Sequence, residues 1–244
     1  MGPLNGIKVL EFSGIGPGPY CGMLLADLGA DVIRLSRVSE KGAHNKFDIH
    51  NRSKRTIVAD LKNPKAIKEI KKIIKEVDVL FEGYRPGVME KLGLSPEKCL
   101  KLNESLVYGR MTGWGQDGPM SNQAGHDINY ISLSGALNAI GDQNSNPSIP
   151  LNLIGDYGGG GMMLAMGILA GVISSSKTGK GQVIDSAMID GSLSLMSFFY
   201  ALKQMGIWKD ERKSNFLDGA AHFYDTYECS DNKYIAVGSI ESQF

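Results

Sequence analysis

Short apolar runs alternate with amphipathic runs along the first half of the chain, and this alternation predicts strands separated by helices. Residues 7–12 and 31–35 have a strand pattern, and residues 20–28 between them have a helical pattern that ends before residue 29, a glycine. An order of this kind is typical of an α/β domain with a doubly wound, Rossmann-like open sheet. The same order continues, with strands predicted at 56–61, 77–81 and 106–108 and helices beginning at Asn63-Pro64 and Ser95-Pro96.

The second half of the chain has longer apolar runs and ends in a hairpin pattern. The uncharged run at residues 162–173 is shorter than a membrane span, so it predicts a core helix and no membrane span. A strand at 182–185 and an apolar helix at 187–205 follow. The alternating runs at 222–229 and 234–238 flank a polar turn and predict a hairpin.

These patterns divide the chain into three parts. We expect a large α/β domain at residues 1–205, a polar linker at 206–220 and the start of a smaller α+β domain at 221–244. One hairpin cannot close a hydrophobic core by itself. The sequence therefore predicts a truncated or partial form, with the C-terminal part of the fold absent.

Composition narrows the classes of function. Hydrophobic residues make up 42% and charged residues 21%, as in ordinary globular proteins. Lys and Arg together number 26, as do Asp and Glu, so no global charge favours nucleic acid as a partner. Three widely spaced cysteines fit a reducing compartment and offer no disulfide framework. With only four histidines, a poly-histidine metal centre is not expected.

The glycine-rich turn after the first strand differs from a dinucleotide-binding fingerprint. The third glycine of such a fingerprint would fall at Pro19, and the second strand ends in Arg34 and Arg37 in place of a ribose-binding acid. A nicotinamide cofactor is therefore disfavoured, whereas arginine suits a phosphate. Residues 34–62, Lys41 among them, are locally basic. Two interpretations stay open for this segment: a solvated loop, or a clamp for a phosphorylated nucleotide.

Three titratable residues are the candidates for chemistry. His126 follows a glycine and opens an apolar helical run, where the helix dipole favours a neutral imidazole that can accept a proton. Asp156 has glycines beside it, which permit close approach of a ligand. Glu241 lies near the end of the chain. Helix capping is an equally simple interpretation of His126 and Asp156 taken one at a time.

Four motifs, taken in their order and spacing, resemble one family. They are GHDINY at 125–130, GDYGGG at 155–160, KTGKGQVID at 177–185 and VGSIESQF at 237–244. On these motifs the chain resembles the CaiB/BaiF-type, family III CoA-transferase superfamily, and within it the alpha-methylacyl-CoA racemases. The resemblance covers essentially the whole chain, but family members continue well past the position of Glu241. It implies the family's intertwined homodimer.

The resemblance implies a racemase that inverts the α-carbon of 2-methyl-branched acyl-CoA thioesters, in branched-chain fatty acid metabolism. Two bases on opposite faces exchange the proton of that carbon through an enolate. By resemblance these are His126 and Asp156, and Glu241, from its own or a neighbouring subunit, orients the imidazole. The backbone N–H of Asp127 is a hypothetical donor to the enolate oxygen. No metal or redox cofactor is required, since coenzyme A enters as part of the substrate.

The resemblance also makes residues 1–205 a CoA-binding domain. Two alternatives remain: a CoA transferase in which Asp156 attacks the thioester, and a non-catalytic acyl-CoA-binding fragment. Family members occur in bacterial cytoplasm, peroxisomes and mitochondria, and the compartment of this chain is left open among these. The family pattern implies coenzyme A contacts at Arg37, Ala59, Asp60, Leu61, Lys62, Gly125 and Tyr130. To these we add three residues of our own, Tyr84, Arg85 and Lys91.

Overall fold

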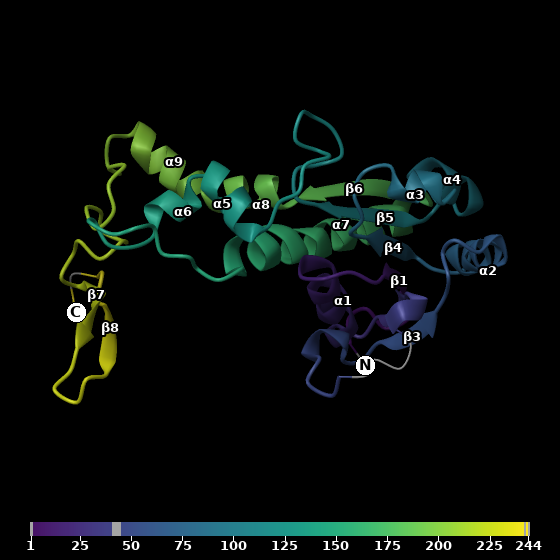
Figure 1. Cartoon of the computed structure of the whole chain (residues 1–244), viewed down its shortest axis with the longest axis horizontal. Helices are drawn as coiled ribbons and strands as arrows, with labels where there is room; N and C mark the ends of the chain where they lie inside the picture. Colours follow the sequence, from purple (N-terminus) through teal and green to yellow (C-terminus); the bar gives the residue numbers. More distant parts are fainter. Residues whose placement is uncertain (1, 41–44, 242, 244) are drawn as a thin grey trace.

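A six-stranded parallel sheet forms the centre of the fold (Figure 1). The computed structural model describes residues 2–40, 45–241 and 243. The strand order is β3-β2-β1-β4-β5-β6, which is that of a Rossmann-like sheet, so the predicted fold class is confirmed. The strands are β1 (Lys8–Phe12), β2 (Asp31–Ser36), β3 (Arg55–Val58), β4 (Val79–Glu82), β5 (Val107–Thr112) and β6 (Gln182–Ala187).

Helices cover both faces of the sheet, and each face has its own hydrophobic core. Because β1 is buried on both faces, its alternate residues enter different cores, Val9 the first and Leu10 the second. The first core is covered by α1 (Pro17–Asp27) and α7 (Met163–Thr178), and the second by α2 (Pro64–Ile74), α3 (Val88–Lys91) and α4 (Pro96–Leu102).

The predicted helix starts on the second face are confirmed. The Asn63 side chain accepts a hydrogen bond from the N–H of Lys65 (2.9 Å) at the start of α2. The Ser95 hydroxyl accepts one from the N–H of Lys98 (3.4 Å) at the start of α4. In both helices proline occupies the first position, where its missing N–H costs nothing.

The long apolar run differs from a simple core helix. It begins as η3 (Leu153–Met162), a π-helix, and continues as α7. Leu164 and Ile168 are buried against the sheet, but Met162 and Met166 are 54% and 61% exposed because α7 covers the sheet with one side only. The prediction of a core helix is therefore right for one side of the run and wrong for the methionines. By length and composition alone, the stretch Leu153–Thr178 would be long and apolar enough to cross a membrane, and it is the one such stretch among the described residues.

Several predicted elements have different bounds, and two of these differences have a structural explanation. The strand expected to reach residue 61 ends at Val58, because its single neighbour β2 ends at Ser36, which lies opposite Val58. The helix expected over residues 187–205 is two helices, α8 (Met188–Leu195) and α9 (Ser197–Gln204). Met196 separates them in a turn-like conformation with φ −83° and ψ −3°.

The predicted hairpin is present as a second, two-stranded sheet, β7 (Tyr224–Glu228) and β8 (Tyr234–Gly238). Figure 1 shows it at the far end of the chain from α2, apart from the main sheet. The domain boundaries around it stay predictions. The remaining short elements are η1 (Val38–Glu40), η2 (Ile49–Asn51), α5 (Asp127–Leu133) and α6 (Ala136–Ala139).

Candidate active site

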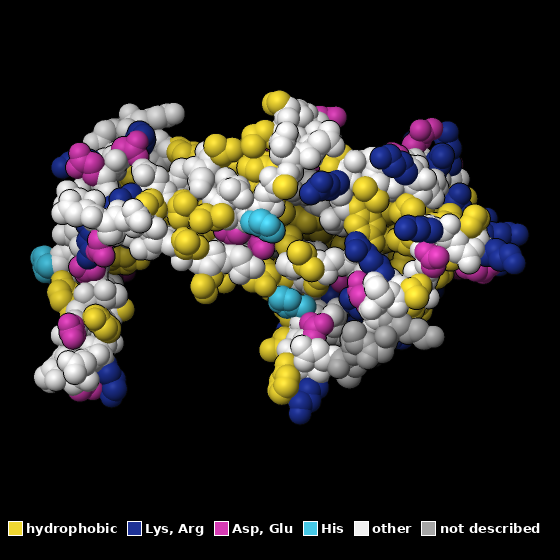
Figure 2. Space-filling model, in the orientation of Figure 1, with side chains coloured by type: hydrophobic (Ala, Val, Ile, Leu, Met, Phe, Trp, Pro, Cys, Tyr) yellow, Lys and Arg dark blue, Asp and Glu magenta, His cyan; other side chains and the backbone are white. Residues whose placement is uncertain are grey.

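A pocket of about 720 Å³ lies at the carboxyl ends of β1, β4 and β5. Loops 12–18 and 83–86 line it from the two strands at which the winding of the sheet reverses. In open α/β sheets ligands bind at such a reversal. Figure 2 shows a hollow near the middle of this face, whereas Lys and Arg side chains gather over α2, α3 and α4.

His126 lies at the start of α5, and its exposed side chain lines the pocket. Its backbone N–H donates to Oδ1 of Asn129 (3.0 Å), and the N–H of Asn129 donates to the His126 carbonyl (2.8 Å). These two bonds fix the backbone at the helix start. Through these backbone bonds His126 occupies the N-cap position of α5, while its side chain lines the pocket.

Asp156 reaches the same pocket from η3. Its Oδ2 accepts a hydrogen bond from Nδ2 of Asn152 (3.1 Å). A Cβ at Gly16 would lie 3.2 Å from this Oδ2, and Gly16 has φ +65°, a conformation that favours glycine. The glycine-rich turn after β1 thus packs against the carboxylate of Asp156.

The π-helix that carries Asp156 is held by glycines. A Cβ on Gly159 would lie 2.8 Å from the backbone nitrogen of Ser192, and one on Gly161 would lie 2.8 Å from the carbonyl oxygen of Pro17. On the α8 side of this contact, a Cβ on Gly191 would come within 1.9 Å of the Gly159 carbonyl oxygen. The glycines therefore allow η3 to pack directly on the backbones of α1 and α8.

Asp127, the first residue of α5, connects α5 to η3. Only 5% of its surface is exposed, and its Oδ2 accepts a hydrogen bond from the N–H of Asp156 (2.7 Å). Burial raises the pKa of this carboxyl, an effect that the hydrogen bond from Asp156 opposes. Asp127 itself does not line the pocket.

Five of the predicted coenzyme A residues line the pocket with His126 and Asp156. These are Arg37, Tyr84, Arg85, Gly125 and Tyr130. The Arg37 guanidinium lies over the Tyr84 ring, 5.6 Å from its centroid.

The other predicted coenzyme A residues lie outside the pocket lining. Residues 59–62 follow β3, which is two strands away from β1, and the N–H of Ala59 donates to the carbonyl of Ser36 (3.0 Å). Lys91 is the last residue of α3. Only a ligand that extends beyond the pocket reaches these positions.

Much of the basic segment is paired with acids. Arg34 bonds to Glu40 (2.7 Å), and Lys54 forms a fully buried ion pair with Glu11 (2.7 Å). Arg52 and Arg55 pair with Asp27 and Asp31. Lys41 lies outside the described residues. The pairing explains four of these cations without a ligand, and among the described residues Arg37 is the cation of the segment that lines the pocket.

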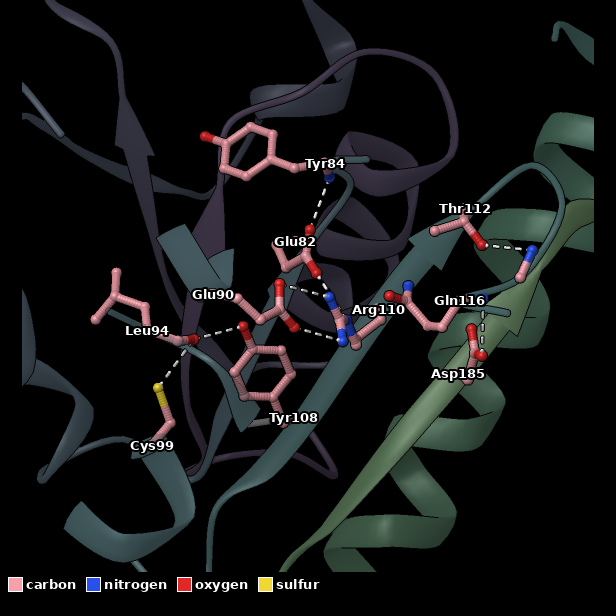
Figure 3. A network of polar contacts seen from close by, with 11 residues as sticks. Glu82, Tyr84, Glu90, Leu94, Cys99, Tyr108, Arg110, Thr112, Gln116 and Asp185 are labelled. Atoms are coloured by element: carbon pink, nitrogen blue, oxygen red, sulfur yellow. Dashed lines mark hydrogen bonds and ion pairs between the residues drawn. The ribbon is translucent and has the colours of Figure 1, made fainter. Parts of the chain in front are cut away.

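A buried polar network holds the loop that carries Tyr84 and Arg85 (Figure 3). Glu82, at the end of β4, accepts a hydrogen bond from the N–H of Tyr84 (2.7 Å) and one from Nε of Arg110 (3.2 Å). Arg110 also pairs with Glu90 of α3 (3.0 Å). Burial raises the pKa of Glu82 to about 7, against the opposing effect of these bonds.

Glu241 follows β8 and is exposed, and it does not line the pocket. Ser242 and Phe244 of the same predicted motif lie outside the described residues. The chain thus brings His126 and Asp156 together, but it does not add Glu241 to them.

Sequence reasoning missed several pocket residues. Asn152 stands four positions before Asp156, a spacing that can place two polar side chains on the same side of a helix. Tyr157 and Trp114 also line the pocket, and the Trp114 ring packs edge-on against Tyr130 at 4.7 Å. Among the described residues no group of three His, Cys, Asp or Glu side chains could hold a metal ion.

The chain is similar in sequence and in structure to known proteins of one family. Residues 4–244 match the model of CoA-transferase family III. Alpha-methylacyl-CoA racemase of mouse is 46% identical over 241 residues, which are 99% of this chain and 62% of that protein. Human succinyl-CoA:glutarate CoA-transferase is 32% identical, over 99% of this chain and 57% of that protein. A CAIB/BAIF family protein from Brucella suis superposes with a TM-score of 0.83 and 27% identity, over 96% of this chain and 65% of its own. The chain thus spans about three fifths of the mouse racemase.

Proposed function

The chain belongs to CoA-transferase family III, and on that premise we propose that it is a racemase of 2-methyl-branched acyl-CoA thioesters. The observation that carries the proposal is that His126 and Asp156 line one pocket from different elements. The 46% identity to mouse alpha-methylacyl-CoA racemase favours this substrate class. The activity belongs to branched-chain fatty acid metabolism.

The proposed reaction needs a base on each face of the α-carbon. One of His126 and Asp156 removes the α-proton, the electron pair moves into the thioester carbonyl as an enolate, and the other returns a proton to the opposite face. Each group ends in the protonation state that the reverse reaction requires. Asp127 is outside the pocket lining, but its backbone N–H lies at the start of α5 directly after His126, and we keep it as the proposed donor to the enolate oxygen. The chemistry uses no metal or redox cofactor.

We assign the coenzyme A part of the substrate to the side of the pocket formed by Arg37, Tyr84 and Arg85. Arginine provides a planar set of donors suited to phosphate oxygens. Residues 59–62 and Lys91 would contact only a portion of the ligand that extends beyond the pocket. The buried network at Glu82 supports this assignment, because it fixes the backbone of Tyr84.

Glu241 has its proposed role, orienting the His126 imidazole, in a homodimer. Because Glu241 is exposed after β8 and outside the pocket lining, we assign it to the His126 of a neighbouring subunit. The proposed compartment is the peroxisome or mitochondrion if the protein is eukaryotic and the cytoplasm if it is bacterial.

A CoA transferase is the second candidate function. The 32% identity to human succinyl-CoA:glutarate CoA-transferase favours it, and in such a reaction the Asp156 carboxylate would attack the thioester and form a mixed anhydride. His126 in the same pocket favours the racemase, since the transferase has no evident use for a base on the opposite face.

One experiment separates the candidates. The protein is incubated with a single enantiomer of a 2-methylacyl-CoA in deuterated water, and inversion and deuterium uptake at the α-carbon are followed. We expect both, with strong loss of both in His126→Ala and no change in His222→Ala, whose side chain is exposed in the hairpin segment. Transfer of CoA to a free acid without deuterium uptake would support the transferase. Binding without either reaction would leave a non-catalytic acyl-CoA-binding chain.

A further inference from the structure

The two proposed acid/bases are connected by a very short path through Asp127. Asp127 follows His126 directly, and its carboxylate accepts a hydrogen bond from the backbone N–H of Asp156 (2.7 Å). The backbones of His126 and Asp156 are therefore joined by one peptide bond, the Asp127 side chain and one hydrogen bond.

The carboxylate of Asp127 is committed to this connection. Asp127 is only 5% exposed, and a Cβ on Gly155 would lie 2.7 Å from its Oδ2, so the π-helix approaches the carboxylate as closely as glycine permits. Among the described residues its other oxygen, Oδ1, is buried without a hydrogen-bond partner. A buried carboxylate whose bond is made to another element holds that element and does not cap its own helix.

We propose that the Asp127 side chain is a positioning residue that sets the separation between His126 and Asp156. The inference rests on the proposed racemase function and adds to it a role for a carboxylate that does not touch the substrate. It is distinct from the proposed role of the Asp127 backbone N–H at the enolate oxygen.

The separation matters differently for the two observable events. Deuterium uptake with retention needs one base at the α-carbon, whereas inversion needs both bases at their correct distances on opposite faces. A misplacement of about 1 Å at a reacting group costs on the order of 100-fold in rate. Loosening the connection should therefore reduce inversion more than exchange.

The test compares Asp127→Ala with Asp127→Asn in the full chain. Alanine removes the acceptor, whereas the asparagine amide oxygen can accept the same hydrogen bond from Asp156. The matched control is Asp78→Ala, which removes a carboxylate bond to the N–H of Lys8 (2.8 Å) at the opposite end of β1. Inversion and deuterium uptake into recovered substrate are measured for each variant.

In Asp127→Ala we expect inversion to fall by about 10- to 100-fold and by at least several-fold more than exchange. Asp127→Asn should keep most of both activities, and Asp78→Ala should keep the wild-type ratio of inversion to exchange. An equal fall of inversion and exchange in Asp127→Ala, or an Asp127→Asn variant as impaired as Asp127→Ala, would overturn the proposal.

A second measurement does not depend on the reaction. The amide proton of Asp156 should lose protection from hydrogen exchange in Asp127→Ala and keep it in Asp127→Asn. Unchanged protection in Asp127→Ala overturns the positioning role whatever the activity. If the wild-type protein neither inverts nor exchanges, the proposed function fails, and the protection of Asp156 still decides whether Asp127 holds it.

Discussion

The buried ion pair between Lys54 and Glu11 makes a pH-dependent prediction about stability. Both side chains are fully buried, and the pair lies directly beneath α1, where a Cβ on Gly22 would come within 2.0 Å of Glu11 Oε2. Lys54 Nζ also donates to the carbonyl of Pro19 (2.9 Å). The perturbation is Lys54→Met, which keeps an unbranched side chain and removes the only cation that pairs with Glu11 among the described residues.

The expected magnitude follows from the pKa of Glu11. Burial raises this pKa to about 7 from 4.5, and Lys54 opposes the increase. Because the folded protein holds the proton more tightly than the unfolded chain, the stability from this group is complete below the unfolded pKa and is lost as pH rises through the folded pKa. Without Lys54 the folded pKa rises further, so the loss continues to higher pH.

The difference between variant and wild type should therefore depend on pH. Above about pH 7 the wild-type Glu11 is ionised, whereas the variant keeps its proton, so the difference in unfolding free energy grows by about 1.4 kcal/mol per pH unit. From about pH 7 to about pH 8.5 this amounts to roughly 2 kcal/mol. Removal of one partner of a buried ion pair lowers the unfolding free energy by about 3–5 kcal/mol in all.

Urea unfolding of both proteins at about pH 6 and about pH 8.5 measures this difference. The matched control is Lys101→Met, whose pair with Glu97 is exposed (2.6 Å) and should leave stability nearly unchanged at both pH values. If Lys54→Met destabilises the protein equally at both pH values, the reasoning from the ionisation of Glu11 is wrong.

Three further predictions test the pocket and the packing of the fold. Arg37→Ala should raise the KM for the acyl-CoA by roughly tenfold or more with little change in kcat, because a charged hydrogen bond to substrate is worth about 1.5–3 kcal/mol. Steady-state kinetics measure both constants, and a fall in kcat alone would contradict the prediction. Gly191→Ala should cost about 1–3 kcal/mol in urea unfolding because its Cβ meets the Gly159 carbonyl, whereas Gly18→Ala, with open space, should not. Asn103→Ala should lower the unfolding free energy by about 1–3 kcal/mol in thermal or urea unfolding, since Nδ2 donates to the carbonyls of Ile74 and Val77.

The architecture was predictable from the sequence because its signals are local. Alternating strand and helix patterns predict the sheet, and Asn63-Pro64 and Ser95-Pro96 begin helices through contacts only two or three residues away. The pocket was predictable in part for the same reason, since loops after parallel strands meet at one edge.

The parts that were not predictable depend on distant partners. The pairing of Lys54 with Glu11 and of Arg52 with Asp27 joins residues far apart in the chain, so the basic segment gave no local sign of being neutralised. The apolar run from residue 162 gave no sign of which side would face solvent. The bond from Asn152 to Asp156 was not predictable either, because two polar residues four positions apart carry no signal that their side chains meet.

The π-helix at residues 153–162 has a consequence for changes of chain length. A π-helix bonds residue i to i+5, so each hydrogen-bonded ring encloses one more residue than in an α-helix. Loss of one residue here can be absorbed by a return to α-helical bonding, with α7 still seated on β5 and β6 behind it. We expect the fold to tolerate such a deletion and the chemistry not to, since the turn that disappears is the one that presents Asp156.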